Sequence, residues 1–553
     1  MIWQQTYDPL GNPWLSTLVA AVPVITLLGS LGLLRLAAHW AALLGLFMSL
    51  VVAIVIFGMP ATTAISTSLY GAAFGLMPIG WIILNIIFLY RLTLDQGLFE
   101  VLQDSIAGIT QDRRLQLLLI AFCFGAFFEG ASGFGTPVAV TGAILIGLGF
   151  PPILASGLSL IANTAPVAFG ALAAPILGLQ SVTGLDLQDL SSMIGRQLPF
   201  FSLIVPFWLI TVFAGWRGMM QVWPAILVAA VSFAVPQFIV SNFYGPTLVD
   251  VVSSLISMAA LVGFLKFWQP KELWLAVTRK GDPNAGDAPP AVTPPKHPLT
   301  LLVRAWTPWV ILTVFVFVWG LPDVKNWIDK QTLLAFPWPE LHNVVQRMPP
   351  VVAKVTQEAA MYRFNWLSMT GSGIAIASLI AGIVMGLTPW RLIVIYGQTL
   401  NLVKFSLVTI AAMMSIGFIT RYSGLDATLG LAFAQTGVLY PFFGTLLGWL
   451  GVALTGSDTS SNVLFGSLQK ISSQQLGLNP ILMASANSSG GVMGKMIDAQ
   501  SIVVAATATR CYGRESEILR FVFFHSIALA CLVGVLVFLQ AYVYPFTLMV
   551  VGG

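Results

Sequence analysis

Long stretches without a charged residue constrain this chain more than any other feature. Asp, Glu, Lys and Arg are absent from residues 36–90, 130–185, 218–249, 427–457, 471–494 and 521–553. A membrane-spanning helix needs about 20 predominantly apolar residues, so each stretch has room for one or two crossings. The whole chain has only 25 Lys+Arg and 21 Asp+Glu in 553 residues, or 8%, whereas soluble domains carry about 25% charge. A soluble multi-domain enzyme is therefore excluded, and 17 Trp and 36 Phe exclude a disordered chain.

The residue pattern within these stretches predicts helices rather than strands. Segments such as GWIILNIIFLY and FVFFHSIALACLVGVLVFLQ are continuously apolar and lack the alternation of a membrane β-barrel. Further apolar runs lie around residues 14–34, 250–268, 304–321 and 367–387. We predict an all-α polytopic membrane protein with about 12 transmembrane helices, in a range of roughly 10 to 14.

Basic residues predict how the chain is oriented, because short loops rich in Lys and Arg stay in the cytoplasm. No Lys or Arg precedes the first predicted span, and Arg510, Arg514 and Arg520 precede the last. Both termini are therefore predicted to lie outside. A Pro-rich cytoplasmic linker at 269–303 separates an N-terminal transmembrane half, 1–268, from a C-terminal half, 304–553, with an extracytoplasmic loop at about 322–366.

Each half interrupts its apolar sequence twice with glycines and small polar residues. The interruptions are 128–140 and 162–175 in the first half, and 454–467 and 486–501 in the second. Breaks at corresponding places in two halves are typical of inverted-repeat transporters with a site near the bilayer midplane. Irregular backbone at membrane depth is tolerated only inside protein or against a water-filled cavity. The sequence thus predicts two inverted-repeat halves with broken or re-entrant helices around a transport site.

Three acidic residues beside the breaks are candidates for proton coupling: Glu129, Asp458 and Asp498. A charge at the centre of a membrane helix costs about 2.5–3.5 kcal/mol, so such residues usually have a function. The structural alternative for Glu129 and Asp458 is an ion pair or a helix N-cap. Lys495 and Asp498 are three positions apart and could pair on a helix. Lys495 is either a counter-ion for an anionic substrate or a snorkelling side chain near a helix end.

The small and polar residues at the breaks are candidates for binding the substrate. Half-helix N-termini attract a carboxylate, and hydroxyl and amide groups can bind it directly. The candidates are Gly130, Ser132, Gly133, Gly135, Thr136, Asn163, Thr164, Thr455, Ser457, Thr459, Ser460, Ser461, Asn462, Asn487, Ser488, Ser489, Gly490 and Lys495. The alternative is that Gly, Ser and Thr only let helices approach closely; four clustered breaks favour a transport site.

No motif in the sequence favours an enzyme. A Walker-type phosphate loop, zinc-ligand spacing and a nucleophile elbow are all missing, and a net charge of +4 needs no nucleic-acid partner. Without an ATP-binding domain, the predicted transporter is a secondary one, driven by an ion gradient.

Several long motifs resemble the lactate permease family of bacterial carriers. They are FCFGAFFEGASGFGTPVAVTGAIL, NTAPVAFGA, GRQLPF, GWLGVALTGSDTSSNVLFGSLQ and GGVMGKMI, and the resemblance covers nearly the whole chain. It implies uptake of L-lactate, D-lactate or glycolate across the plasma membrane by proton symport, with no resident cofactor. In a Gram-negative bacterium this is the inner membrane. Glu129, Asp458 and Lys495 fall inside the most distinctive motifs.

This chain departs from the family pattern at four positions. It has Ser132 and Thr136 where Ala is usual, Arg421 where Asn is usual, and Asp498 where Ser is usual. A charge pair between Arg421 and Asp498 is one consequence we expect. The departures leave the class of transporter intact but leave open which 2-hydroxy monocarboxylate it carries.

Other functions remain open from sequence. A sodium-coupled organic-anion carrier is the first alternative, since unwound carbonyls can hold Na⁺, and a channel or receptor is the second. Analogy with other carriers built from broken helices suggests a homodimer.

Overall fold

The chain forms a bundle of helices with a small β-structured region. The computed structural model describes residues 2–552, apart from 33, 35, 132, 134, 276–296 and 353. Most of the predicted linker, 276–296, thus lies outside the described residues. The helices before the linker are α1 (Pro13–Gly32), α2 (Ala38–Val51), α3 (Ala61–Phe74), α4 (Trp81–Asp95), α5 (Leu98–Ile109), α6 (Arg113–Leu117), α7 (Gly125–Ala131), α8 (Thr136–Gly147), α9 (Pro152–Ala162), α10 (Gly170–Thr183), α11 (Leu187–Phe243) and α12 (Val249–Leu265).

The part of the chain after the linker is also helical. Its helices are α13 (Leu299–Gly320), α14 (Pro322–Thr332), α15 (Thr370–Val384), α16 (Pro389–Ser423), α17 (Leu425–Ala434), α18 (Tyr440–Thr455), α19 (Asp458–Gln475), α20 (Pro480–Gly494), α21 (Ala499–Ala508) and α22 (Glu515–Tyr542). Short π or 3-10 segments are η1 (Val52–Ile56), η2 (Gly75–Gly80), η3 (Leu118–Phe124), η4 (Val167–Phe169), η5 (Gly437–Leu439) and η6 (Phe546–Met549).

Several helices in the described part of the chain are long and apolar enough to cross a membrane. In the described part of the chain, four continuous helices qualify: His39–Ile56, Leu187–Phe243, Gly437–Thr455 and Glu515–Tyr542. Two bent pairs also qualify, one of which joins Pro152–Ala162 to Val167–Gln180 at 67°. Five shorter apolar helices accompany them. The prediction of a polytopic helical protein with broken helices is confirmed.

The longest helix, α11, is two helices in succession. Its 57 residues correspond to roughly 85 Å at 1.5 Å per residue, far more than a bilayer is thick. Gly215 interrupts it with φ 71° and ψ 174°, a conformation that glycine adopts without a steric penalty. Each part is about 28 residues long and is sufficient for one crossing.

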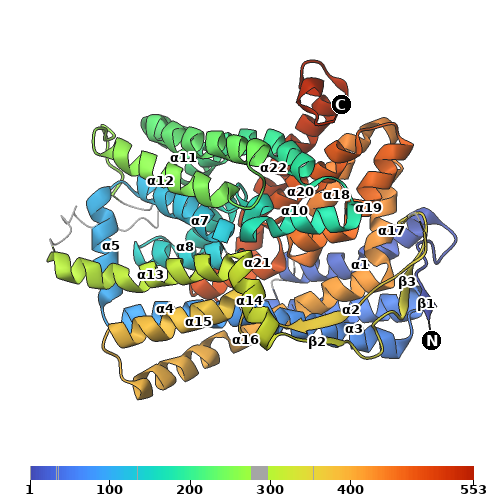
Figure 1. Ribbon diagram of the computed structural model, residues 1–553, viewed down its shortest axis with the longest axis horizontal. Coiled ribbons are helices and arrows are strands. Elements are labelled where there is room, and N and C mark those ends of the chain that lie inside the picture. The colour runs from blue at the N-terminus through green and yellow to red at the C-terminus, as the bar shows by residue number, and fades with distance from the viewer. Residues whose placement is uncertain are drawn as a thin grey trace.

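Helices from both sides of the linker pack against one another. α16 lies along α2 and α3, α15 lies along α4, and α10 contacts α19. In Figure 1, α5 and the start of α13 lie at the left end, while the N-terminus lies at the right end. The centre of the bundle is densely packed, because residues 136–145 of α8 and 482–494 of α20 are all buried. These two helix segments are therefore surrounded by protein.

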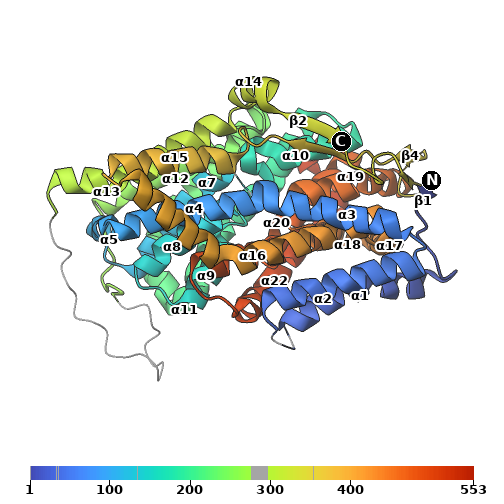
Figure 2. The same ribbon diagram turned by 90° about the horizontal axis from the view of Figure 1, so that it is seen from below.

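The segment 322–366 forms a cap (α14 and strands β2–β5) that also engages the N-terminus. Strand β2 (Leu334–Pro337) pairs antiparallel with β5 (Met361–Phe364), and β3 (Val345–Arg347) pairs antiparallel with β4 (Thr356–Gln357). β1 (Trp3–Gln4) adds to β3 in parallel. Figure 2 shows α14 and β2 along one side of the bundle. The extracytoplasmic side of the cap stays a prediction.

A buried ion pair holds the cap to the bundle. Glu358, which is 8% exposed, contacts Arg347 at 3.4 Å and Arg421 of α16 at 3.2 Å. Burial raises the pKa of Glu358, but the two guanidinium groups lower it by more, so its pKa lies below the ordinary value. Arg421 is therefore paired with Glu358, and the expected pair between Arg421 and Asp498 is wrong.

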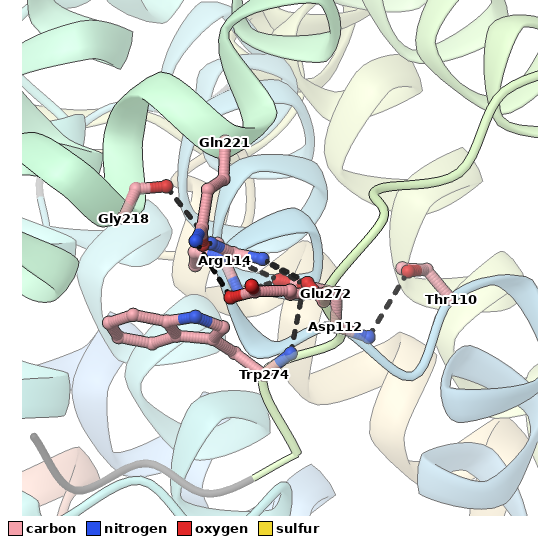
Figure 3. A network of polar contacts seen from close by, with 7 residues as sticks. All are labelled: Thr110, Asp112, Arg114, Gly218, Gln221, Glu272 and Trp274. Atoms are coloured by element: carbon pink, nitrogen blue, oxygen red, sulfur yellow. Dashed lines mark hydrogen bonds and ion pairs between the residues drawn. The ribbon is translucent and has the colours of Figure 1, made fainter. Parts of the chain in front are cut away.

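A second buried network fixes the start of the linker (Figure 3). Arg114 and Asp112 are both fully buried and pair at 2.6 Å. Arg114 also donates to the Gly218 and Glu272 carbonyl oxygens, at 3.0 and 2.8 Å. The Trp274 amide donates to Asp112 at 3.1 Å, and the Trp274 ring lies 4.8 Å from the guanidinium carbon. The pair thus ties α6 to α11 and to residues 272–274.

Replacing Arg114 should destabilise the protein strongly. Arg114→Ala leaves the Asp112 carboxylate buried without its partner, a change that typically costs about 3–5 kcal/mol. We expect a clear fall in the thermal unfolding midpoint of the detergent-purified protein. The control is Arg514→Ala, which removes an exposed pair with Glu517 and should change the midpoint little. Equal midpoints for the two variants contradict this assignment.

The cap should loosen in acid. Because Glu358 has a lowered pKa in the folded protein, its ion pairs contribute stability above its ordinary pKa of about 4.3, and this contribution is lost as pH falls through the lowered value. We expect limited proteolysis of the cap to accelerate below about pH 4. Glu358→Gln should be cut faster at neutral pH and should lose most of this acid dependence. An unchanged acid dependence in that variant removes Glu358 as the cause.

Candidate functional site

The four sequence interruptions meet around one small cavity. It has a volume of about 30 Å³ and is lined from α7, α10, the start of α19 and the end of α20. Its charged side chains are Glu129, Asp458 and Lys495, and its hydroxyls are those of Ser457 and Thr459. Breaks that are far apart in sequence therefore supply the two carboxyl groups and the ammonium group of a single site.

Glu129 lies at the end of α7 and is 4% exposed. Its Oε2 accepts a hydrogen bond from Asn163 Nδ2 at 3.0 Å, so the first two breaks contact each other directly. A Cβ atom on Gly170 would lie 2.5 Å from Glu129 Oε1, so a side chain there would displace the Glu129 carboxyl group. The carboxyl group is thus packed tightly against the backbone that begins α10.

That backbone has an unusual conformation. Ala171, Leu172 and Ala173 have φ of 48°, 54° and 67°, in the left-handed region that costs L-residues about 1–2 kcal/mol each. Strain of this kind persists where the surroundings enforce it, and it is frequent at functional sites. Here it turns the chain around Glu129 before α10 resumes.

Asp458 begins α19 and faces the cavity from the other half. Ser457 is the N-cap residue, because its Oγ accepts from the Ser460 amide at 3.3 Å. The N-cap alternative for Asp458 is therefore wrong. Asp458 Oδ2 accepts from Ser488 Oγ at 2.6 Å and from Asn462 Nδ2 at 3.4 Å, whereas Oδ1 is buried without a hydrogen-bond partner in the described structure.

Lys495 is the cation of the site. Its Nζ donates to the Gly456 carbonyl oxygen at 2.7 Å and pairs with Asp498 at 3.2 Å, as the spacing of three residues predicts. Lys495 is 4% exposed, so the snorkelling alternative is wrong. Asp498 also caps α21, accepting from the Ser501 amide at 2.6 Å, and it does not line the cavity.

Several predicted binding residues lie behind the cavity and support it. Asn487 donates to Asn462 Oδ1 at 2.9 Å and accepts from Gln469 at 3.1 Å. Ser489 donates to Gln197 of α11 at 2.7 Å, and Ser461 donates to the Gly448 carbonyl at 3.1 Å. These contacts fix α18, α19 and α20 against one another.

The remaining predicted binding residues mostly serve backbone packing. A Cβ on Gly490 would lie 2.1 Å from the Thr445 carbonyl oxygen, and one on Gly135 would lie 3.2 Å from Val504. Thr455 donates to a backbone carbonyl of its own helix and Thr164 to the Ile161 carbonyl near the end of α9, and Thr136 is fully buried. Gly133 lines the cavity, and Ser132 lies outside the described residues.

Sequence reasoning missed Asp250. This residue directly follows the charge-free stretch 218–249 and has the appearance of a charge at a helix end. In the structure it is 1% exposed, and a Cβ on Gly130 would lie 2.6 Å from Asp250 Cβ. The sequence signal that could have identified Asp250 is an acidic residue in the first turn of an apolar helix.

The site carries more buried acid than buried base. Glu129 and Asp458 are both attracted to Lys495, and Glu129 repels Asp458 and Asp250. Burying a carboxylate without a compensating partner is very costly, and in practice the group takes up a proton. The arrangement can therefore bind a small anion at Lys495 and protons on its carboxyl groups.

Comparison with known proteins identifies the family. The family model for L-lactate permease matches residues 16–544. The L-lactate permease of Salmonella typhimurium is 45% identical over 98% of each chain. The glycolate permease of Escherichia coli K12 is 46% identical, again over 98% of each chain.

Among solved structures, the YdaH transporter of Alcanivorax borkumensis aligns with a TM-score of 0.32 and 13% identity, over 87% of this chain and 88% of that one. The family assignment does not depend on this distant similarity. From the family model and the relatives, this multi-pass membrane protein belongs to the L-lactate permease family.

Proposed function

We propose that the protein imports lactate, and glycolate or related 2-hydroxy monocarboxylates, across the plasma membrane by proton symport. The observation that carries this proposal is the buried cavity in which Lys495 faces Glu129 and Asp458. Lactate permeases and a glycolate permease among the relatives support the substrate class.

The substrate carboxylate is proposed to bind between Lys495 and the first turn of α19. Ser457 and Thr459 line the cavity at that turn, and the amide groups of a helix N-terminus favour an anion. The Lys495 ammonium now donates to the Gly456 carbonyl and could exchange that contact for the substrate. The hydroxyl groups of Ser457 and Thr459 can form hydrogen bonds with the 2-hydroxyl group of the substrate.

Proton coupling follows from charge. The membrane potential opposes the entry of an anion into a negative interior, at a cost of about 2.3 kcal/mol per elementary charge for each 100 mV. Transport of one proton with each substrate anion makes the cycle electroneutral. An anion beside Glu129 and Asp458 also adds a negative charge to an acidic site, so substrate and proton binding favour each other. Glu129, which lines the cavity and contacts Asn163, is the proposed carrier; Asp458 and Asp498 are the further candidates.

The cavity supports an alternating-access cycle. About 30 Å³ has room for a few water molecules at most, so the described conformation has too little space for the substrate. Substrate entry requires the broken helices to move apart. The helix segments would change their relative orientation at the breaks. The two halves of the chain both contribute to the site and would move relative to each other.

Transport by purified protein in liposomes tests this function. We expect uphill uptake of radiolabelled L-lactate, D-lactate or glycolate when the outside is acidic, and none when only a sodium gradient is imposed. Uptake that follows Na⁺ and ignores pH contradicts proton symport and favours the sodium-coupled alternative.

Glu129→Gln should separate coupling from binding. The amide keeps the shape of the side chain but cannot take up and release a proton. The pH-driven accumulation should therefore fall at least tenfold, about 1.4 kcal/mol, while exchange of labelled for unlabelled substrate continues. Glu100→Gln, an exposed acid in the first turn of α5, is the control. Normal accumulation by Glu129→Gln removes Glu129 from the proton path.

Lys495→Ala should weaken substrate binding. A hydrogen bond to a charged group contributes about 1.5–3 kcal/mol, so the KM for lactate should rise at least tenfold. The matched control is Lys470→Ala, because Lys470 also donates to a backbone carbonyl, that of Thr183, but does not line the cavity. Equal KM values for the two variants demote Lys495 to a structural residue.

A further inference from the structure

Asp250 is a buried carboxyl group with no visible partner. It is the second residue of α12 and is 1% exposed, and neither of its oxygen atoms has a hydrogen-bond partner in the described structure. Native proteins satisfy most buried polar atoms, so a carboxyl group with both oxygens unpartnered needs an explanation.

A bound proton is the neutralisation that this environment allows. An isolated buried carboxylate is far more costly than a protonated carboxyl group. A metal cation needs several oxygen ligands around it, and Asp250 shares no group of three or more His, Cys, Asp or Glu with the other described residues. The first turn of α12 adds only a partial positive charge.

The surroundings of Asp250 connect it to the transport site. Asp250 packs against Gly130, the residue after Glu129, on the facing helix α7. Glu129 is the charged group that acts on Asp250 within the described residues, and it does so by repulsion. Two other elements pack against α12, and their contacts with it are uncharged. Cys123 of η3 contacts Ser257, which lies two turns after Asp250, and the same serine donates to the Ala229 carbonyl oxygen of α11.

We propose that Asp250 is a second proton-binding site of this transporter, coupled to Glu129. Two neighbouring carboxyl groups that repel each other titrate as a pair. The proton leaves the Asp250 oxygen and binds a Glu129 oxygen, and the negative charge moves from Glu129 to Asp250. Asp250 thereby passes a proton to the cavity from the α12 side. The relay rests on the proposed proton symport; proton binding by Asp250 does not.

Infrared spectroscopy tests proton binding without any substrate. Protonated carboxyl groups have a C=O stretching band that carboxylates lack. In purified protein at neutral pH, Asp250→Asn should remove one such component. The matched control is Asp323→Asn, because Asp323 is also the second residue of a helix, α14, but is exposed. A band unchanged by Asp250→Asn overturns the proposal, whether or not the protein transports lactate.

Transport measurements test the relay. Asp250→Asn should lower pH-driven accumulation at least tenfold and leave exchange of labelled substrate within twofold of the unmodified protein. Because both residues lie on one proton path, adding Asp250→Asn to Glu129→Gln should cause no further loss. Accumulation that is normal in Asp250→Asn, or losses that multiply in the double variant, overturn the relay.

Folding is controlled separately. Asp250→Asn is nearly isosteric and removes no hydrogen bond seen in the structure, so its unfolding midpoint should match that of Asp323→Asn. Absence of lactate transport by the unmodified protein contradicts the proposed function and the relay together, while the infrared result still decides whether Asp250 binds a proton.

Discussion

The imbalance of buried charge around Lys495 governs the central part of this structure. Glu129, Asp458, Asp498 and Asp250 are each at most 4% exposed, and Lys495 is the ammonium group that faces three of them. A buried carboxylate needs a partner cation, hydrogen bonds or a proton. Lys495 pairs with Asp498, and amide or hydroxyl groups contact Glu129 and Asp458, whereas Asp250 has neither kind of partner among the described residues. The proposed proton symport uses this imbalance, because protons can balance the buried carboxylates and an arriving anion changes that balance.

Close helix packing makes such a site possible. A Cβ on Gly448 would lie 2.0 Å from the Asn487 carbonyl oxygen, and one on Gly494 would lie 2.4 Å from that of Trp449. Where α18 and α20 approach this closely, Asn487 can reach Asn462 and Gln469 directly. Small residues therefore have two effects here: they let helices break, and they bring the remaining polar side chains within hydrogen-bonding distance. The same glycines and serines therefore serve helix packing, and substrate binding by them stays a prediction.

The sequence predicted the helical membrane fold, and it singled out the three charged residues that line the cavity, for a simple physical reason. A charge inside apolar sequence is expensive, so Glu129, Asp458 and Lys495 stood out. Asp250 did not, because it closely follows the turn at Gly245 and Pro246 and has the appearance of a charge at a helix end. The left-handed turn at Ala171–Ala173 could not be foreseen from residues that individually favour right-handed helix. The pairing of Arg421 with Glu358 depends on how the cap folds back over α16, which periodicity does not reveal.

The cap and the transport site are mechanically connected through α19. Arg347 contacts Glu358 in the cap and also donates to the Leu464 carbonyl oxygen at 3.2 Å, and Leu464 lies two turns after Asp458 on the same helix. Arg421 joins the same carboxylate from the end of α16. A movement of α19 that opens the cavity must therefore either carry the cap with it or break a buried ion pair. Since breaking such a pair is costly, the movement of α19 together with the cap is favoured.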